Sequence, residues 1–296
     1  MGGLSLNPVN LKFVLNIQVK LMTIQTLILG ATSVGIGYAL SHSDCIIAEK
    51  GMNLCVDYTD CMNICPVDNA LLDGYTPEVR EMYAEAMAKN LVGEEGALHP
   101  FPLIGITAAH LLAKEVSVLS FCEAESVQRD KNGFFVHLYC VNSHITISCE
   151  KIIDATAYDD PVFAETFLPS LGKGEGITTC IAASLRTKTN ETTVCALPNG
   201  ARIIRGRFAD EAYLELSLSP GDSYREGFAK LHTLYQKLSA DSAFSGYEYI
   251  DTAGELIYRT PDFSFTKVTT GVCRLRPATK RDIFFNLNAA YVLPAV

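Results

Sequence analysis

Two short apolar runs near the start of the chain have the length and composition of buried parallel strands. They cover residues 23–29 and 45–48, and residues 30–35 between them form a glycine turn that leads into a helix beginning at 34–41. The chain therefore opens with a predicted strand–turn–helix–strand unit.

Two helical stretches follow, and the apolar pattern then changes its period. Residues 77–90 are amphipathic, and residues 101–114 are mostly apolar. From Val116 the apolar positions alternate with a period of two, which predicts an antiparallel meander. Its strands are expected at residues 116–121, 124–129, 134–141 and 144–149. A further buried strand, 151–154, runs into Ala155-Thr156-Ala157.

A loop rich in proline and glycine, residues 161–176, separates this part from a second group of elements. Strands are expected at 177–186, 192–197, 201–205, 213–218 and 247–258, with a helix at 223–240. Residues from Thr260 onward show no regular pattern. The order predicts an α/β protein with a parallel-sheet domain made of residues 22–160 and 261–296. A mixed sheet-and-helix domain, 161–260, is inserted into it, and residues 1–21 are a leader that fits neither domain.

Composition narrows the classes of partner. The chain has 296 residues, of which 48% are hydrophobic, so it can bury a large core. A net charge of -9 argues against a nucleic-acid partner, because such proteins need a basic face. The balance is typical of a soluble cytoplasmic protein.

Residues 21–41 contain no charged side chain and are long enough to span a membrane or to act as a signal sequence. Glycine, threonine and serine in the middle of the segment favour a strand, a turn and a helix instead. A membrane span also leaves the acid at Glu49 unexplained. We expect no membrane segment.

The turn itself is the sharpest chemical signal. It contains Gly30-Ala31-Thr32-Ser33-Val34-Gly35, and Glu49 ends the second strand about 20 residues after the first glycine. Such a turn aims backbone N–H groups and the positive end of a helix at a pyrophosphate. Gly30 permits the tight turn, Gly35 permits close packing, and Glu49 is placed to bind a ribose hydroxyl pair. The alternative is an ordinary βαβ unit that binds nothing.

Residues 24–51 resemble the N-terminal FAD-binding segment of glutathione-reductase-type flavoproteins. In that family a small antiparallel meander precedes a strand that ends in an Ala-Thr-Gly motif beside the cofactor. Asp154-Ala155-Thr156-Ala157 is similar to that motif and follows the predicted meander. The resemblance implies a Rossmann-like FAD-binding domain and an oxidoreductase that transfers a hydride between an organic substrate and the flavin. The implied cofactor-binding residues are Gly30, Ala31, Thr32, Ser33, Gly35, Glu49, Lys50, Ala124, Ala155 and Thr156. No catalytic residue is identified.

The sequence departs from the family pattern at several points. Thr32 replaces the second glycine, where its hydroxyl could donate to a phosphate oxygen, and Ala157 replaces the glycine of the later motif. The helix before Glu49 is about one turn shorter than usual. The late Gly-Asp motif, whose acid holds the ribityl chain, is not recognisable near the C-terminus. Gly221-Asp222 is a candidate for it, although its position suits a helix cap better.

Two rival interpretations follow from these departures. A short-chain dehydrogenase binding NAD(P) has a similar glycine turn but needs a Tyr-x-x-x-Lys pair, and none of the 13 tyrosines has lysine four positions on. A flavoprotein relative that has lost its cofactor would keep the fold for structural or ligand-binding work.

The remaining candidates are weaker. His99 could face the flavin or be a plain loop residue. Five basic residues could bind an acidic substrate or form a solvated face: Lys173, Arg186, Arg202, Arg205 and Arg207. The ten cysteines are expected to be reduced and buried, and no metal site is expected, since Cys55-x5-Cys61-x3-Cys65 fits neither a zinc ribbon nor a ferredoxin cluster. A redox pair or metal site near the flavin is the alternative for that cluster.

Overall fold

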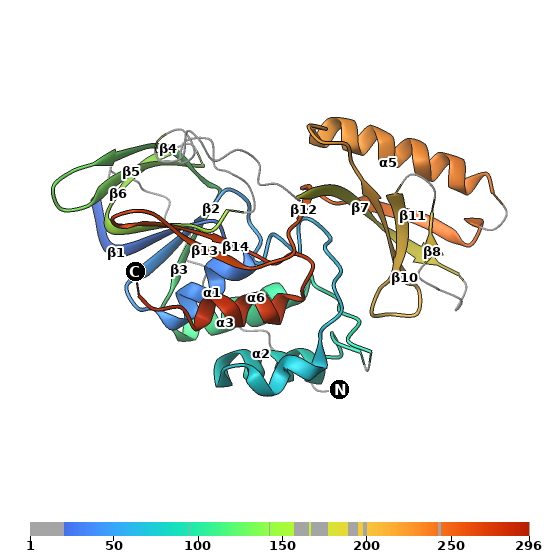
Figure 1. The fold of residues 1–296 in the computed structure, drawn as a ribbon, viewed down its shortest axis with the longest axis horizontal. Helices are drawn as coiled ribbons and strands as arrows, with labels where there is room; N and C mark the ends of the chain where they lie inside the picture. The colour runs from blue at the N-terminus through green and yellow to red at the C-terminus, as the bar shows by residue number, and fades with distance from the viewer. Residues whose placement is uncertain are drawn as a thin grey trace, which may run out of the picture.

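The computed structural model describes residues 21–93, 95–141, 143–156, 166, 177–188, 195–197, 200–241 and 244–295. These residues are arranged around two sheets, which form the two lobes seen in Figure 1. The predicted loop at 161–176 and Ala157 lie outside the described residues, apart from Thr166.

The larger sheet has eight strands among the described residues, and its parallel part forms the centre of the first lobe. Its main order is β13-β14-β6-β1-β2-β3, in which β14, β6, β1, β2 and β3 run parallel, and β4 and β5 extend it as an antiparallel meander. The strands are β1 (Leu21–Leu29), β2 (Cys45–Glu49), β3 (Ser117–Ser120), β4 (Cys122–Arg129), β5 (Phe134–Cys140), β6 (Ser143–Asp154), β13 (Ser264–Thr269) and β14 (Val272–Arg276).

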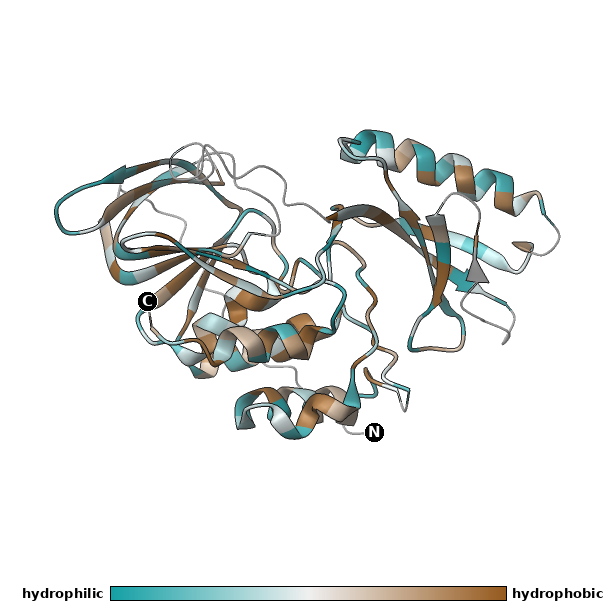
Figure 2. Ribbon diagram, viewed as in Figure 1, coloured by the Kyte–Doolittle hydropathy of each residue, from teal (hydrophilic) through white to brown (hydrophobic). Residues whose placement is uncertain are grey.

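Helices cover one face of this parallel sheet and the meander covers the other (Figure 1). The helical layer consists of α1 (Ser33–Ser41), α2 (Pro77–Ala88), α3 (Leu103–Ala113) and α6 (Ile283–Tyr291), with a 3₁₀ turn at Asn69–Gly74. Hydrophobic residues are concentrated along the central strands and along α1 (Figure 2), as expected for strands buried on both faces.

The smaller sheet has six strands among the described residues, in the order β11-β7-β10-β9-β8 with β12 also paired to β7. The elements are β7 (Thr178–Thr187), β8 (Cys195–Ala196), β9 (Ala201–Arg205), β10 (Glu211–Ser217), β11 (Tyr247–Thr252), β12 (Ile257–Arg259) and helix α5 (Tyr224–Ser239). Helix α5 is amphipathic and packs its apolar face on the sheet (Figures 1 and 2). Ser223 caps it through a reciprocal capping box with Glu226.

The predicted strand–turn–helix–strand opening is confirmed, so residues 21–41 do not form a membrane span. None of the helices in the described part of the chain combines the length and apolar character needed to cross a membrane.

Four details of the predicted elements are wrong. The first strand expected in the meander, 116–121, is β3, which pairs parallel with β2 in the main sheet. The strands expected at 144–149 and 151–154 form one continuous strand, β6, which pairs antiparallel with β5 over residues 143–149 and parallel with β1 over residues 146–154. The strand expected at 247–258 is two strands, β11 and β12. Residues from Thr260 onward, expected to be irregular, contain β13, β14 and α6.

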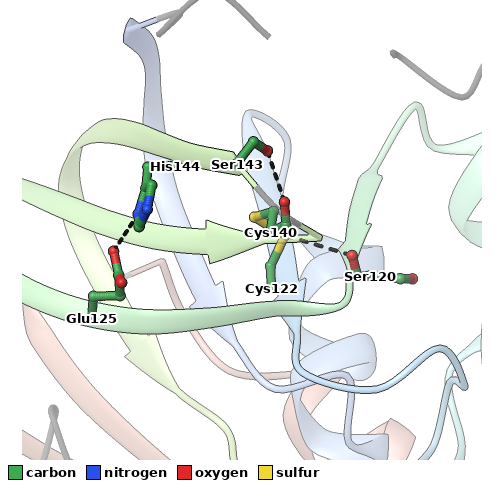
Figure 3. Close-up of a disulfide and its surroundings, with 6 residues drawn as sticks. All are labelled: Ser120, Cys122, Glu125, Cys140, Ser143 and His144. Carbon is green, nitrogen blue, oxygen red and sulfur yellow. Dashed lines mark hydrogen bonds and ion pairs between the residues drawn. A yellow bond between two sulfur atoms is a disulfide. The ribbon is translucent and has the colours of Figure 1, made fainter. Parts of the chain in front are cut away.

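The cross-strand pair Cys122 and Cys140 forms a disulfide, so the expectation of ten reduced thiols is wrong for these two residues. They lie directly opposite each other on β4 and β5, with Cα atoms 4.3 Å apart. Figure 3 shows the bond at the end of the meander, beside the hydrogen bond from Ser143 to the Cys140 carbonyl. The described free cysteines are all buried.

Reduction of this disulfide is expected to lower the free energy of unfolding by roughly 3 kcal/mol, because the bond closes a loop of 18 residues in the unfolded chain. Urea denaturation with and without dithiothreitol measures the difference. The double variant Cys122→Ala/Cys140→Ala should be insensitive to the reductant. Equal stability of the oxidised and reduced natural protein would contradict the prediction.

Helices α1 and α6 approach closely at Gly37. A Cβ atom at this position would lie 2.2 Å from the carbonyl oxygen of Leu287, so only glycine allows the contact. We expect Gly37→Ala to destabilise the protein by about 1–3 kcal/mol, because the helices must separate. Gly105→Ala, in α3 where a Cβ would meet nothing, should instead stabilise it by about 0.5–1 kcal/mol. Chemical denaturation compares the two, and a neutral Gly37→Ala would refute the close packing.

Candidate nucleotide-binding site

The carboxyl ends of β1, β2 and β6 meet at the predicted glycine turn. Gly30 has a φ of +97°, and a Cβ there would lie 2.8 Å from the carbonyl oxygen of Ala155. A Cβ on Gly35 would lie 2.4 Å from the Gly30 carbonyl oxygen. The tight turn and close packing predicted for these glycines are therefore present.

Thr32 caps helix α1 and joins the turn to β6. Its hydroxyl donates to the carbonyl oxygen of Ala155 at 2.5 Å and accepts the N–H of Gly35 at 3.3 Å. The side chain is fully buried. The expectation that this hydroxyl donates to a phosphate is not met here, because its proton is directed at Ala155.

Glu49 ends β2 underneath the turn and is 3% exposed. One carboxylate oxygen accepts the N–H of Ala31 at 2.7 Å, and the other accepts the N–H of Gly51 at 2.8 Å. Burial raises the pKa of Glu49, and these two hydrogen bonds oppose that rise. Each oxygen keeps a further lone pair, so the carboxylate can still accept a ribose hydroxyl.

Asp57 lies at the first turn of α1, and the sequence did not suggest it. Its Oδ1 accepts the backbone N–H of Ser33 at 2.8 Å, and its Oδ2 accepts the Ser33 hydroxyl at 2.5 Å. The side chain is 2% exposed. Burial raises the pKa of Asp57 to about 6, although both bonds from Ser33 favour the ionised form and Glu49 disfavours it. The helix end therefore already binds an anion, supplied by the chain itself.

The end of β6 carries a buried acid between two arginines. Asp154 is fully buried, and its Oδ2 accepts from Arg274 Nε and Arg276 Nη2, each at 2.9 Å. Its Oδ1 accepts the N–H and the hydroxyl of Thr156. Beside it, β14 ends in Arg276-Pro277, so the described residues contain no Gly-Asp pair at this sheet edge. The acid at this edge, Asp154, is instead paired with the cationic side chains of Arg274 and Arg276.

Gly221-Asp222 does not lie at this sheet edge. It immediately precedes helix α5, where Asp222 accepts the Ser219 N–H and pairs with Lys230. The cap of α5 is Ser223, the next residue, so the helix-cap interpretation of this pair is off by one position.

Eight of the ten predicted cofactor residues gather at the turn: Gly30, Ala31, Thr32, Ser33, Gly35, Glu49, Ala155 and Thr156. The other two do not line it. Lys50 forms an ion pair of 2.9 Å with Glu255, and Ala124 packs in the core between the sheet and the meander.

The weaker candidates are dispersed. His99 Nδ1 pairs with Glu211 Oε1 at 2.6 Å, which joins the loop before α3 to β10. Arg202 pairs with Glu215, and Arg207 bonds to Asn90. Arg186 and Arg205 are exposed, and Lys173 lies outside the described residues. Among the described residues, the four candidate arginines therefore do not converge on one anionic substrate.

The cluster Cys55, Cys61 and Cys65 consists of buried thiols. They contact Thr107 Oγ1, the Leu256 carbonyl and the Thr279 carbonyl respectively, and burial raises the pKa of all three. Within the described residues, no three His, Cys, Asp or Glu side chains could hold a metal ion together. All three thiols are buried, as the sequence predicted.

A cavity of about 20 Å³ lies beside Asp57, between the two sheets. Cys61, Tyr258, Arg276 and Thr279 also line it. This volume holds about one water molecule.

No protein-family model matches the sequence, and no curated protein is similar to it in sequence. Structures with a similar fold have been solved, among them an FAD complex and a flavoprotein. Aklavinone-11 hydroxylase, solved with FAD and aklavinone, superposes with a TM-score of 0.63 at 11% identity over 90% of this chain. p-Nitrophenol 4-monooxygenase from Pseudomonas putida gives 0.57 at 11% identity over 86% of this chain. Glycine oxidase from Bacillus cereus gives 0.57 at 11% identity over 90% of this chain.

This chain spans 60% of the length of the aklavinone hydroxylase, 72% of the monooxygenase and 93% of the oxidase. At these identities the likeness concerns the fold. The protein therefore has the Rossmann-like α/β fold of FAD-binding flavoproteins, as the sequence predicted.

Asp57 is expected to make the protein less stable as the pH rises from about 4 to about 6. Its pKa is about 6 in the folded protein against an ordinary 3.8, so the folded state holds the proton more tightly than the unfolded state. The free energy of unfolding should fall across this window by at most roughly 3 kcal/mol from this group. Asp57→Asn should remove that part of the slope in urea denaturation curves. An identical slope in both proteins would contradict the assignment.

Proposed function

We propose that this protein binds FAD and acts as an FAD-dependent oxidoreductase on a small organic molecule. The observation that carries the proposal is the glycine turn with buried Glu49 at the carboxyl edge of the parallel sheet. In doubly wound folds, dinucleotides bind at this edge, with the pyrophosphate at the helix N-terminus and an acid on the ribose.

The turn meets the chemical demands of a dinucleotide. The absence of side chains at Gly30 and Gly35 leaves the backbone of the turn accessible. The first turn of α1 already binds the Asp57 carboxylate, which occupies the place proposed for the phosphate. In this proposal the backbone at Ala31, Thr32 and Ser33 holds the pyrophosphate and Glu49 holds the ribose. Ala155 and Thr156 lie beside the cofactor. The Asp57 carboxylate must be neutralised or displaced for the phosphate to bind at the helix end.

The proposal extends the layout inferred from the sequence. Residues 22–160 and 261–296 form the FAD-binding domain, residues 161–260 form the substrate domain, and the protein is cytoplasmic. A segment of glutathione-reductase type at 24–51 is part of the proposal, in which Lys50 and Ala124 hold no part of the cofactor. No nucleic-acid partner is proposed.

Bound FAD would supply the redox chemistry, by exchanging a hydride with the substrate at the flavin N5. The contribution of the chain is then to position the cofactor and to exclude water. Asp154, which is neutralised by Arg274 and Arg276, supports the backbone of Thr156 at the edge of the proposed site.

A second candidate function is favoured by one observation. Asp57 occupies the helix end where the pyrophosphate would bind, and the cavity beside it holds about one water molecule. A flavoprotein relative that has lost its cofactor, and keeps the fold for ligand binding or structure, accounts for both features. FAD binding separates the two candidates.

Glu49→Gln is expected to weaken FAD binding about 10- to 100-fold, because a neutral amide replaces the charged acceptor for the ribose hydroxyls. Titration of flavin fluorescence with the purified protein measures the affinity. Glu255→Gln, which loses only the surface pair with Lys50, is the matched control and should bind FAD as the natural protein does.

The purified protein is expected to take up FAD. If neither it nor Asp57→Asn does so and both stay colourless, the FAD proposal is contradicted and the cofactor-free candidate is favoured. Binding of NADP(H) but not FAD would instead support a dehydrogenase.

A further inference from the structure

The backbone donor at the first turn of α1 is already bonded to a carboxylate from elsewhere in the chain. Asp57 takes both the N–H and the hydroxyl of Ser33, across 24 positions of sequence. A phosphate oxygen at this helix end would need the same N–H group. The donors of Ser33 can therefore bind either the Asp57 carboxylate or a phosphate.

Asp57 is held in this place by a segment that is anchored on both sides. The N–H of Val56 donates to the Ala31 carbonyl at 3.4 Å. The hydroxyl of Tyr58 donates to the Arg281 carbonyl at 2.6 Å and accepts from Asn286. The carboxylate therefore reaches the helix end as part of a packed segment, and does not swing there as a surface side chain.

The electrostatics oppose a second anion at the same place. The partial positive charge of a helix end is about half an elementary charge, and Asp57 already uses it. The titratable and charged side chains that face Asp57 come from β2, from its own segment and from the cavity beside it: Glu49, Cys55, Tyr58, Cys61, Tyr258 and Arg276. The cation among them, Arg276, is paired with Asp154. A pyrophosphate beside ionised Asp57 would meet net repulsion.

We infer that Asp57 is an intramolecular competitor of the cofactor phosphate: its carboxylate occupies the anion position of the nucleotide fold, and a dinucleotide binds only when that carboxylate is neutral or displaced. The inference rests on the proposed FAD site for the identity of the ligand. The competition itself concerns any phosphate at this helix end.

The competition predicts a specific dependence on proton concentration. Because burial raises the pKa of Asp57 to about 6, the carboxyl is neutral near pH 5 and ionised above pH 7. FAD affinity of the natural protein should therefore rise as the pH falls through this range. Glu49 is common to the natural protein and to Asp57 variants, so the difference between them isolates Asp57.

The test compares the full-length natural protein with Asp57→Asn, which keeps the shape but not the charge, and with Asp57→Ala. Asp60→Asn is the matched control, because Asp60 lies in the same segment but bonds to Asn53 and Thr59, not to α1. At about pH 7.5, Asp57→Asn should bind FAD at least about tenfold more tightly than the natural protein, and Asp60→Asn should not. The gain should vanish near pH 5.

Inorganic pyrophosphate separates failure of this inference from failure of the FAD proposal. It should raise the melting temperature of Asp57→Ala but not that of the natural protein at about pH 7.5. If pyrophosphate has this effect but no variant binds FAD, the competition at the helix end is supported and the FAD function is contradicted.

Equal affinities of the natural protein and Asp57→Asn, for both FAD and pyrophosphate, would overturn the inference. If Asp57→Ala fails to fold, the comparison of Asp57→Asn with the natural protein across this pH range decides the outcome. An affinity difference between these two proteins that does not change with pH would count equally against the inference.

Discussion

The close approach of Gly30 to the backbone of Ala155 and Thr156 is the constraint on which the site depends. A side chain at Gly30 would overlap that backbone, and the Thr32 hydroxyl ties the same turn to Ala155. The ends of β1 and β6 are thereby held together, and α1 starts directly above them. Every donor at the helix end, including the N–H of Ser33, has its direction set by this contact.

One segment after β2 determines how much of the flavoprotein fold is open to a ligand. Asp57 occupies the end of α1, while Cys61, Met62 and Ile64 pack against the face of the smaller sheet that α5 leaves uncovered. Arg259 reinforces this packing by bonding to Asn63, Glu215 and the Thr279 carbonyl. The same stretch of chain thus joins the two sheets and fills the space between them.

Local signals were enough to predict the opening unit and the meander. The apolar runs, the glycine turn and the period of two each depend on neighbouring residues, and all three are present in the fold. Strand β13 was missed because its residues are exposed or half-buried and show no alternation. Helix α6 did carry a signal, since Asp282 caps a run in which Ile283, Phe284, Leu287 and Ala290 have helical spacing.

The contacts of Asp57 and of Cys122 were beyond prediction from the sequence. Ser33 and Asp57 are 24 positions apart with no regular element around Asp57, so only the fold brings them together. Cys122 and Cys140 meet because of the register of two strands, and a shift by one residue would separate them. Likewise, the partner of Lys50, Glu255, lies in the loop between β11 and β12.

The position of β14 in the large sheet determines the order in which parts of the protein can fold during synthesis. This strand pairs with β6 near the centre of the large sheet, yet it follows the whole smaller sheet along the chain. During synthesis, one edge of the last part of β6, residues 152–154, therefore stays unpaired until residue 276 has been made, whereas β5 covers that edge over residues 143–149. An open apolar edge of this kind is a template for pairing with other chains. The smaller sheet, whose strands are contiguous in the chain, can form while that edge waits.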